Sequence, residues 1–511
     1  MRPVLIDKIS RVGLMVLSVV MAFATFACFY LALLELKGIG FGLPAPSVVA
    51  GILAVTILMI VATFRSRIAV FFLEIERIPH LFWIALALGI AMRIAWWWLT
   101  LPEVQVSDGA SYLKLANMLY AGQDYSLLGH AFWPPGTPLV YAAFLFLMGQ
   151  HSWIALPVNL LSFILCAISV RAIFARLGMP SFAGLSVALL AIWPELFFTA
   201  GQVSKETLLL SLLSGGFALL LSRSGWLSIV SGMVCGLAAL TQPALLFLPL
   251  LFGFGIVGRG YPSKQILLRL FAVVIGMALV ISPWTYRNYR VFGEFVPIST
   301  NLGLTLHAAN QPAMVLAMED VGEFIMPAAP QRPFKDDLES SRWHTAEAVK
   351  FIKEYPGDFL FLVRNRLTRI VGDDGDSAFR SLRSTQKASR TGYAAAKALS
   401  NAYWLMLTSM LCIFCWNFRD QEALRRAAPV IFLATLATLY AMGVFGIVEG
   451  SGRHHMGWSW IYSVLLTLIL SCATKSVTGK VPTSTKVGPL KTARPYQIAL
   501  RFRTSPLILK E

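Results

Sequence analysis

Asp108 is the residue of this chain whose type and position most favour chemistry. It lies in the segment VQVSDGASYLKLA, directly after an apolar run, and Ser107 before it is a plausible helix N-cap. A helix dipole favours the ionised form of an acid in its first turn. Such a carboxylate can take the proton of an attacking hydroxyl group as a general base. Asp108 could also be only a first-turn acid, and its position alone does not decide.

A second acid, Glu206, follows Lys205 at the start of another apolar run. It is a candidate for substrate binding in the same site. The alternative interpretation is that Glu206 serves as the N-terminal acid of its helix, and we favour this alternative on position alone.

Two clusters invite a metal interpretation, and neither supports it well. Asp373, Asp374 and Asp376 in VGDDGDS offer oxygen ligands but lack EF-hand spacing, so we expect solvated loop acids. His454 and His455 have no third ligand within helical reach. The sequence therefore predicts no metal site and no cofactor, although a divalent cation at the acidic cluster stays open.

Composition defines the solvent in which these residues act. The 511 residues are 57% hydrophobic and only 14% charged, whereas an average soluble domain is about 25% charged. Apolar stretches of roughly 17 to 25 residues recur along the chain, which is the length that crosses a bilayer. The net charge of +17 comes from basic residues between apolar runs and in the tail, so it favours membrane lipids and excludes a nucleic-acid partner.

The hydrophobic pattern predicts an all-α polytopic membrane protein of about twelve transmembrane helices. We expect them at 12–36, 47–64, 81–100, 152–174, 181–200, 205–222, 226–241, 243–258, 266–286, 398–417, 427–447 and 455–473. Lys and Arg concentrate on one set of alternating connections, which predicts cytoplasmic termini. Asp108, Glu206, Arg453 and the 287–397 segment should then share the outer face.

The chain is expected to divide into five parts. These are an N-terminal transmembrane pair (1–80), a transmembrane core (81–286) with a first outer loop (101–151), an outer, periplasmic loop domain (287–397), C-terminal transmembrane helices (398–473) and a basic cytoplasmic tail (474–511) that we expect to be disordered. The outer segments should contain a juxtamembrane or re-entrant helix at 134–149 and an amphipathic helix near 346–370.

Four blocks of sequence carry a resemblance to a known superfamily. They are the Asp108 segment followed by WPPGTP at 133–138, GLAALTQP at 236–243, SPWTYRNYRVFGEFVPISTN at 282–301, and EGSGRHHM at 449–456. In this order the chain, from about residue 85 to 473, resembles membrane glycosyltransferases of the GT-C fold, the superfamily of protein O-mannosyltransferases and the aminoarabinose transferase of lipid A. The third block is the most specific of the four.

The resemblance implies a GT-C-like bundle and a function. Such enzymes transfer a sugar from a polyprenyl-phosphate donor, and Asp108 matches their presumed catalytic base. The implied acceptor is a cell-envelope glycan or glycolipid, in polysaccharide, exopolysaccharide or lipopolysaccharide biosynthesis at the cell inner membrane. A donor phosphate needs cations, so Arg287, Arg290 and Arg453 are its candidate ligands, because guanidinium groups suit phosphate oxygens. The alternatives are that Arg287 and Arg290 flank a span and that Arg453 pairs with Glu449.

The same resemblance singles out further residues for substrate binding. They are Tyr112, Gln242, His307 and Glu449, in addition to Glu206. The chain departs from the superfamily at Gln242, where many relatives have arginine, and near His307, where many have an aromatic residue. A lone loop histidine is also commonly just a surface residue.

Two other functions compete with that of a glycosyltransferase. A polysaccharide polymerase or ligase would have a large outer loop near its C-terminal third, which 287–397 matches, but it would not need Asp108. A transporter of lipid-linked saccharides should show repeated halves with interrupted helices, and the sequence shows no such symmetry.

Overall fold

The computed structural model describes residues 3–38, 45–127, 129–320, 325–328, 333–385 and 389–478, and in this part of the chain every regular element is a helix. The elements are α1 (Pro3–Gly38), α2 (Pro46–Glu76), α3 (Leu81–Thr100), α4 (Asp108–Tyr120), α5 (Gly136–Met148), α6 (Ala155–Arg176), η1 (Pro180–Phe182), α7 (Ala183–Ala191), α8 (Pro194–Phe198), α9 (Lys205–Leu220), α10 (Leu227–Thr241), η2 (Pro243–Phe247), α11 (Leu248–Val257), α12 (Ser263–Phe292), α13 (Leu302–Ala309), α14 (Pro312–Asp320), α15 (Asp337–Glu354), α16 (Pro356–Gly372), α17 (Asp376–Arg383), α18 (Arg390–Asn417), α19 (Gln421–Ile447), η3 (Gly452–Trp458) and α20 (Ser459–Thr478). The predicted all-α polytopic membrane fold is confirmed. The tail beyond residue 478, which we expect to be disordered, lies outside the described residues.

The predicted spans correspond to helices of the structure, but not all of these are long. Among the described residues, 8 helices are long and apolar enough to cross a membrane, namely α1, α2, α3, α6, α12, α18, α19 and the η3–α20 unit. The segments predicted at 181–200, 205–222, 226–241 and 243–258 form shorter helices. Proline explains two of them, because Pro194 begins α8 inside the segment predicted at 181–200, and Pro249 stands in the first turn of α11 inside the segment predicted at 243–258.

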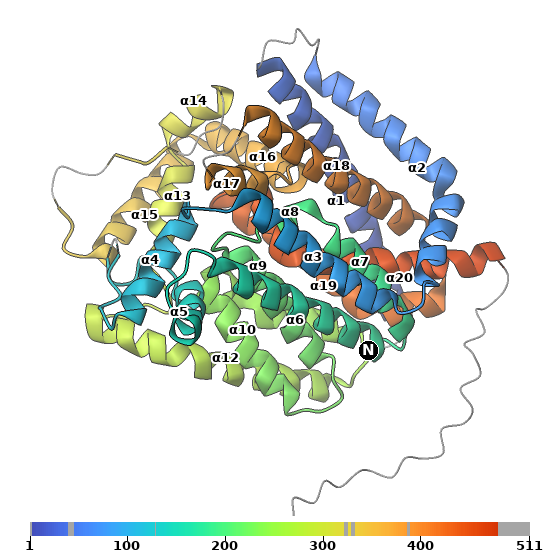
Figure 1. Cartoon of the computed structure of the whole chain (residues 1–511), viewed down its shortest axis with the longest axis horizontal. Helices are drawn as coiled ribbons and strands as arrows, with labels where there is room; N and C mark the ends of the chain where they lie inside the picture. The colour runs from blue at the N-terminus through green and yellow to red at the C-terminus, as the bar shows by residue number, and fades with distance from the viewer. Residues whose placement is uncertain are drawn as a thin grey trace, which may run out of the picture.

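The bundle is built around its C-terminal helix. The apolar window of the η3–α20 unit is 100% buried, whereas that of α2 is 17% buried. Helices α2, α7, α18 and α19 pack against α20, and α1 packs against α18 and α19. A second group consists of α6, α9, α10 and α12, in which α10 contacts both α9 and α12. Figure 1 shows α4, α5, α13 and α15 gathered at one side of this bundle.

The predicted juxtamembrane helix at 134–149 is α5, which spans Gly136–Met148 and is too short to cross a bilayer. Its first turn packs closely on the end of α10. A Cβ atom on Gly136 would lie 2.4 Å from the backbone nitrogen of Thr241, so only glycine fits there.

The segment 287–397 differs from the prediction in its helices. The amphipathic helix expected near 346–370 is two helices, α15 and α16, because Pro356 lacks an N–H and begins a new first turn. Helix α18 begins at Arg390, earlier than the predicted 398. Helix α16 packs against α1, α19 and η3, so its C-terminal end reaches into the bundle.

Candidate active site

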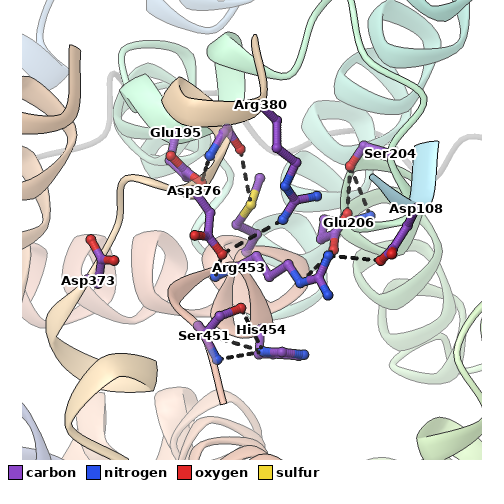
Figure 2. A network of polar contacts seen from close by, with 12 residues as sticks. Asp108, Glu195, Ser204, Glu206, Asp373, Asp376, Arg380, Ser451, Arg453 and His454 are labelled. Carbon is purple, nitrogen blue, oxygen red and sulfur yellow. Dashed lines mark hydrogen bonds and ion pairs between the residues drawn. The ribbon is translucent and has the colours of Figure 1, made fainter. Parts of the chain in front are cut away.

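Arg453 is the centre of a cluster that joins four of the residues singled out in the sequence. Its Nη1 donates to Oδ2 of Asp108 at 2.9 Å, its Nη2 donates to Oε1 of Glu449 at 3.1 Å, and its Nε lies 4.0 Å from Oε1 of Glu206. The Arg453 side chain is 11% exposed. Figure 2 shows Arg453 reaching toward Asp108 and Glu206 from η3. One buried cation therefore holds carboxylates from three other segments.

A glutamine brings Asp108 and Glu206 together. The Gln105 side chain donates to the carbonyl of Gly201 at 3.0 Å and accepts from the backbone N–H of Val203 at 2.7 Å. It thereby ties the segment before α4 to the segment before α9. Asp108 is the first residue of α4 and Ser107 occupies its N-cap position, as predicted, but Ser107 has φ 54° and its side chain makes no capping hydrogen bond.

Glu206 fits both interpretations drawn from the sequence. It stands in the first turn of α9, where its N–H donates to Oγ of the N-cap Ser204 at 3.2 Å, and Ser204 donates to Oε2 at 2.8 Å. Its other oxygen, Oε1, is buried without a hydrogen-bond partner and faces Arg453. Glu206 is thus a helix-start acid and a member of the cluster.

The short helix η3 presents Arg453. It starts at Ser451, whose side chain forms a capping box with His454. The backbone N–H of Arg453 points to Oδ2 of Asp376 at 3.4 Å. A Cβ atom on Gly452 would lie 2.1 Å from the carbonyl oxygen of Asp373, so the chain can pass the 373–376 loop only with glycine at this position.

The acidic loop after α16 is a correction to the sequence analysis, which expected solvated acids. Asp374 is 0% exposed; Trp193 donates to its Oδ2 at 2.8 Å, and His455 contacts its Oδ1 at 2.8 Å. Asp373 and Asp376 are 22% and 29% exposed in their side chains. The expectation fails because α16 packs into the bundle and carries this loop inward.

Two further charged residues of the site were missed by the sequence analysis. Arg380 in α17 lies 3.7 Å from Asp376, and Figure 2 shows it on the same side of Arg453 as Asp376. Glu195 in α8 is 0% exposed; its Oε1 accepts from the N–H of Ser377 at 2.6 Å and its Oε2 has no partner. An acid inside the apolar run IWPELFF is a signal that could have identified Glu195.

The charges around Asp108 decide its protonation. Burial alone would raise the pKa of Asp108, but the positive charges of Arg453, Lys205 and Arg380 outweigh it and hold the pKa below the ordinary range. Burial likewise opposes the ionisation of Glu449, and Arg453 again prevails, so the pKa of Glu449 is lowered. Asp108 is therefore a carboxylate at neutral pH and able to accept a proton.

Tyr112 lies one helical turn after Asp108 and is buried. Its ring packs edge-on against Trp133, with centroids 5.4 Å apart. Burial, and then the negative charges of Asp108 and Glu206, raise the pKa of Tyr112 well above its ordinary value. Tyr112 thus keeps its phenolic proton.

A cavity adjoins the cluster and includes Gln242. It lies between α9, η2, α19 and η3 and has a volume of about 10 Å³, which is room for about one water molecule. Its polar lining comes from Glu206, Gln242, Arg453 and His454, and the remaining lining residues are Leu209, Leu213, Leu245, Tyr440, Phe445, Gly457 and Trp458. The cavity therefore has a charged side at Arg453 and a largely apolar remainder.

The structure does not bring the other predicted residues to this cluster. Arg287 donates to the backbone carbonyls of Tyr125 and His130, and Arg290 donates to the hydroxyl of Tyr286 at 3.3 Å. His307 Nδ1 lies 2.9 Å from Nδ1 of His344. In the described part of the chain, no hydrogen bond or ion pair joins these three residues to Asp108 or Arg453. No group of three or more metal-binding side chains occurs among the described residues either.

Comparisons with known proteins give matches at the level of structure. No family model and no curated protein matches the sequence. The archaeal oligosaccharyltransferase AglB of Archaeoglobus fulgidus, solved with an inhibitory peptide and a dolichol-phosphate, is 15% identical, with a TM-score of 0.47 over 80% of this chain and 52% of that chain. The chain therefore spans about half the length of AglB.

A second match is ArnT of Cupriavidus metallidurans, solved with undecaprenyl phosphate. It is 15% identical, with a TM-score of 0.36 over 77% of this chain and 78% of that chain. The likeness concerns the course of the helices, and what this chain does has to be inferred from its own site.

Proposed function

We propose that this multi-pass membrane protein is a glycosyltransferase that moves a sugar from a polyprenyl-phosphate donor to a glycan or glycolipid acceptor. One observation carries the proposal: the ionised carboxylate of Asp108 and the guanidinium of Arg453 meet at 2.9 Å in a site that is largely shielded from water. A base and a phosphate-binding cation are the two groups that such a transfer requires.

The reaction would be a single displacement at the anomeric carbon. The acceptor oxygen forms a bond to that carbon while its proton passes to Asp108, and the bond from the anomeric carbon to the phosphate oxygen breaks. The phosphate leaves with the electron pair of that bond, and the configuration at the carbon inverts. The lowered pKa keeps Asp108 ionised, and so ready to receive a proton, before the reaction.

Arg453 would stabilise the charge that develops on the leaving phosphate. Its guanidinium is fixed in place before a donor arrives, because Asp108 and Glu449 each hold one nitrogen. Preorganised donors of this kind are effective because no reorientation is needed during the reaction. Gln242 and Glu206, which line the small cavity beside Arg453, are the polar groups available to hydroxyl groups of the donor.

The proposal also assigns a place in the cell. We expect the site to face the periplasm or outside and both termini to lie in the cytoplasm, which is supported by the distribution of Lys and Arg along the sequence. A transferase on that face needs a lipid-carried sugar, because nucleotide sugars are cytoplasmic. The expected pathway is the synthesis of a cell-envelope polysaccharide or lipopolysaccharide in the inner membrane.

A deletion strain tests this function. Its envelope glycans and its lipid-linked saccharides are analysed together after complementation with the wild-type gene or with Asp108→Asn. We expect the deletion and the Asp108→Asn strain to lack the same single sugar and to accumulate the same polyprenyl-phosphate sugar. Glycans of full composition but reduced chain length would favour a polymerase or ligase, and an accumulating donor confined to the cytoplasmic leaflet would favour a transporter.

A further inference from the structure

Two residues after Arg453, the chain is anchored by a buried histidine. His455 is 4% exposed, its Nδ1 lies 3.0 Å from the carbonyl oxygen of Ile370, and its Nε2 lies 2.8 Å from Oδ1 of Asp374. Its ring stacks on Trp404, with centroids 4.3 Å apart and an interplanar angle of 7°. Position, tilt and both nitrogen atoms of this imidazole are therefore fixed by the surrounding protein.

Asp374 is itself held by two other parts of the bundle. Its Oδ2 accepts from the indole N–H of Trp193, between α7 and α8, at 2.8 Å. Its backbone N–H donates to Oδ1 of Asn401 in α18 at 2.8 Å. A single buried acid thus connects η3 with the end of α16, with the α7–α8 break and with α18.

The protons of this pair follow from its partners. A carbonyl oxygen only accepts, so Nδ1 of His455 must carry a hydrogen toward Ile370. One further proton then lies between Nε2 of His455 and Oδ1 of Asp374, since neither atom has another partner at that position. Whichever atom holds that proton, the pair as a whole is neutral. It can act as an anchor without placing a net charge in the protein interior.

We propose that Asp374 and His455 form a positioning pair that holds η3 so that the guanidinium of Arg453 faces Asp108. Neither residue contacts Asp108 among the described hydrogen bonds and ion pairs, so their effect passes through Arg453. The same loop supplies a second attachment, because Oδ2 of Asp376 receives the backbone N–H of Arg453 at 3.4 Å. The function of the pair in catalysis rests on the proposed glycosyltransferase activity, but its effect on Arg453 does not.

The pair has a measurable consequence at Asp108. Arg453 is the first of the positive charges that keep the pKa of this acid low, ahead of Lys205 in α9 and Arg380 in α17. If η3 shifts, burial is no longer outweighed, and the pKa of Asp108 rises. The other titratable groups that act on Asp108 or Asp374 are Cys28, Tyr112, Glu195, Asp373, Asp376, Tyr403, Glu449 and His455, and Glu206 acts on Arg453.

Infrared spectroscopy of the full-length protein in lipid nanodiscs can follow Asp108 directly. The carboxyl band of Asp108 is obtained by subtracting the spectrum of a matched protein that also carries Asp108→Asn. We expect Asp108 to remain a carboxylate at about pH 4, near the ordinary midpoint of aspartate, in the wild type. In Asp374→Ala, half or more of Asp108 should be protonated at that pH, because an opposite charge at this distance shifts a pKa by about 1 to 3 units.

Asp374→Asn separates positioning from charge. An asparagine amide can donate to Nε2 of a neutral His455 while its oxygen accepts from Trp193, so every hydrogen bond of the pair is retained. This variant should therefore titrate like the wild type. Asp420→Ala controls for a general loss of stability. Asp420 is the N-cap of α19 and accepts a hydrogen bond from the N–H of Ala423, at the end of α19 that lies away from the site.

The outcomes are distinct. Protonation of Asp108 in Asp374→Ala but not in Asp374→Asn or Asp420→Ala supports the positioning pair. If Asp108 stays ionised at that pH in a folded Asp374→Ala protein, the proposed positioning pair is wrong. If Asp374→Ala does not fold, His455→Phe, which keeps the stacking on Trp404 and removes both hydrogen bonds, gives the same test. A wild-type protein that transfers no sugar would refute the proposed function and leave this measurement valid.

Discussion

Replacing Arg453 with alanine should expose how strongly the cluster depends on one cation. The change leaves Asp108, Glu206 and Glu449 close together without their common partner. At an effective dielectric constant near 20, one pair of unit charges about 4 Å apart interacts by about 4 kcal/mol. Breaking a buried ion pair from one side typically costs about 3–5 kcal/mol. We therefore expect Arg453→Ala to lose about 3–5 kcal/mol of stability at neutral pH.

The loss should depend on pH, and its sign follows from the lowered pKa of Asp108 and Glu449. In the wild type these acids add stability above their ordinary midpoints near pH ~4, and this stability is lost as the pH falls through their lower folded values. In Arg453→Ala the buried acids become easier to protonate and oppose folding once ionised. The wild type still has most of this stability at pH 4, so the difference between the two proteins should already be present there and grow toward pH 7 as the buried acids of the variant ionise.

Thermal unfolding of the detergent-purified proteins at several pH values measures this difference. Arg342→Ala is a matched control, because Arg342 forms an exposed ion pair with Glu294 in which both side chains are about half exposed. Exposed pairs contribute about 0–1 kcal/mol, so this variant should change little at any pH. A loss in Arg453→Ala that is equal at both ends of the pH range would refute the account of the cluster.

Three further predictions concern the surroundings of the site. Gly452→Ala should cost about 1–3 kcal/mol and lower activity, since its Cβ would lie 2.1 Å from a backbone oxygen; a normal melting temperature would contradict the packing of η3. Arg287→Ala should lower stability, because the guanidinium of Arg287 donates to two backbone carbonyls, and it should raise the KM for the donor less than Arg453→Lys does. A larger increase in KM than that of Arg453→Lys would show that Arg287 binds the donor phosphate. Reporter fusions at Lys475 and Ser340 should report opposite compartments, and agreement between them would overturn the proposed sidedness.

The sequence identified much of the site because its residues follow local rules. Asp108 and Glu206 stand at helix starts, and Glu449 and Arg453 lie just before the last apolar run, so each has a signal in its own segment. The charge distribution predicts that Asp108, Glu206 and Arg453 share one face. A shared face is compatible with contacts between these residues. From the sequence alone, however, Glu449 was the only partner proposed for Arg453.

The missed features depend on packing between distant segments. Nothing local to VGDDGDS shows that α16 carries Asp374 against Trp193, which lies far away in the sequence. Arg287 is a different case: its segment resembles a functional block, and in the structure its guanidinium donates to the backbone carbonyls of Tyr125 and His130. Helix lengths failed for a simpler reason, since Pro194 and Pro356 interrupt patterns that hydrophobicity alone reads as continuous.

The most direct test of the central claim is a single-turnover transfer assay on purified Asp108→Asn, with polyprenyl-phosphate sugars from the deletion strain as donor. The matched control is Asp336→Asn, because Asp336 is also an acid at a helix start and caps α15 through Glu339. General-base catalysis contributes about 100- to 10,000-fold in rate. We predict that Asp108→Asn loses transfer by that factor while donor binding and folding persist, and that Asp336→Asn keeps its activity. Normal transfer by folded Asp108→Asn would contradict the account.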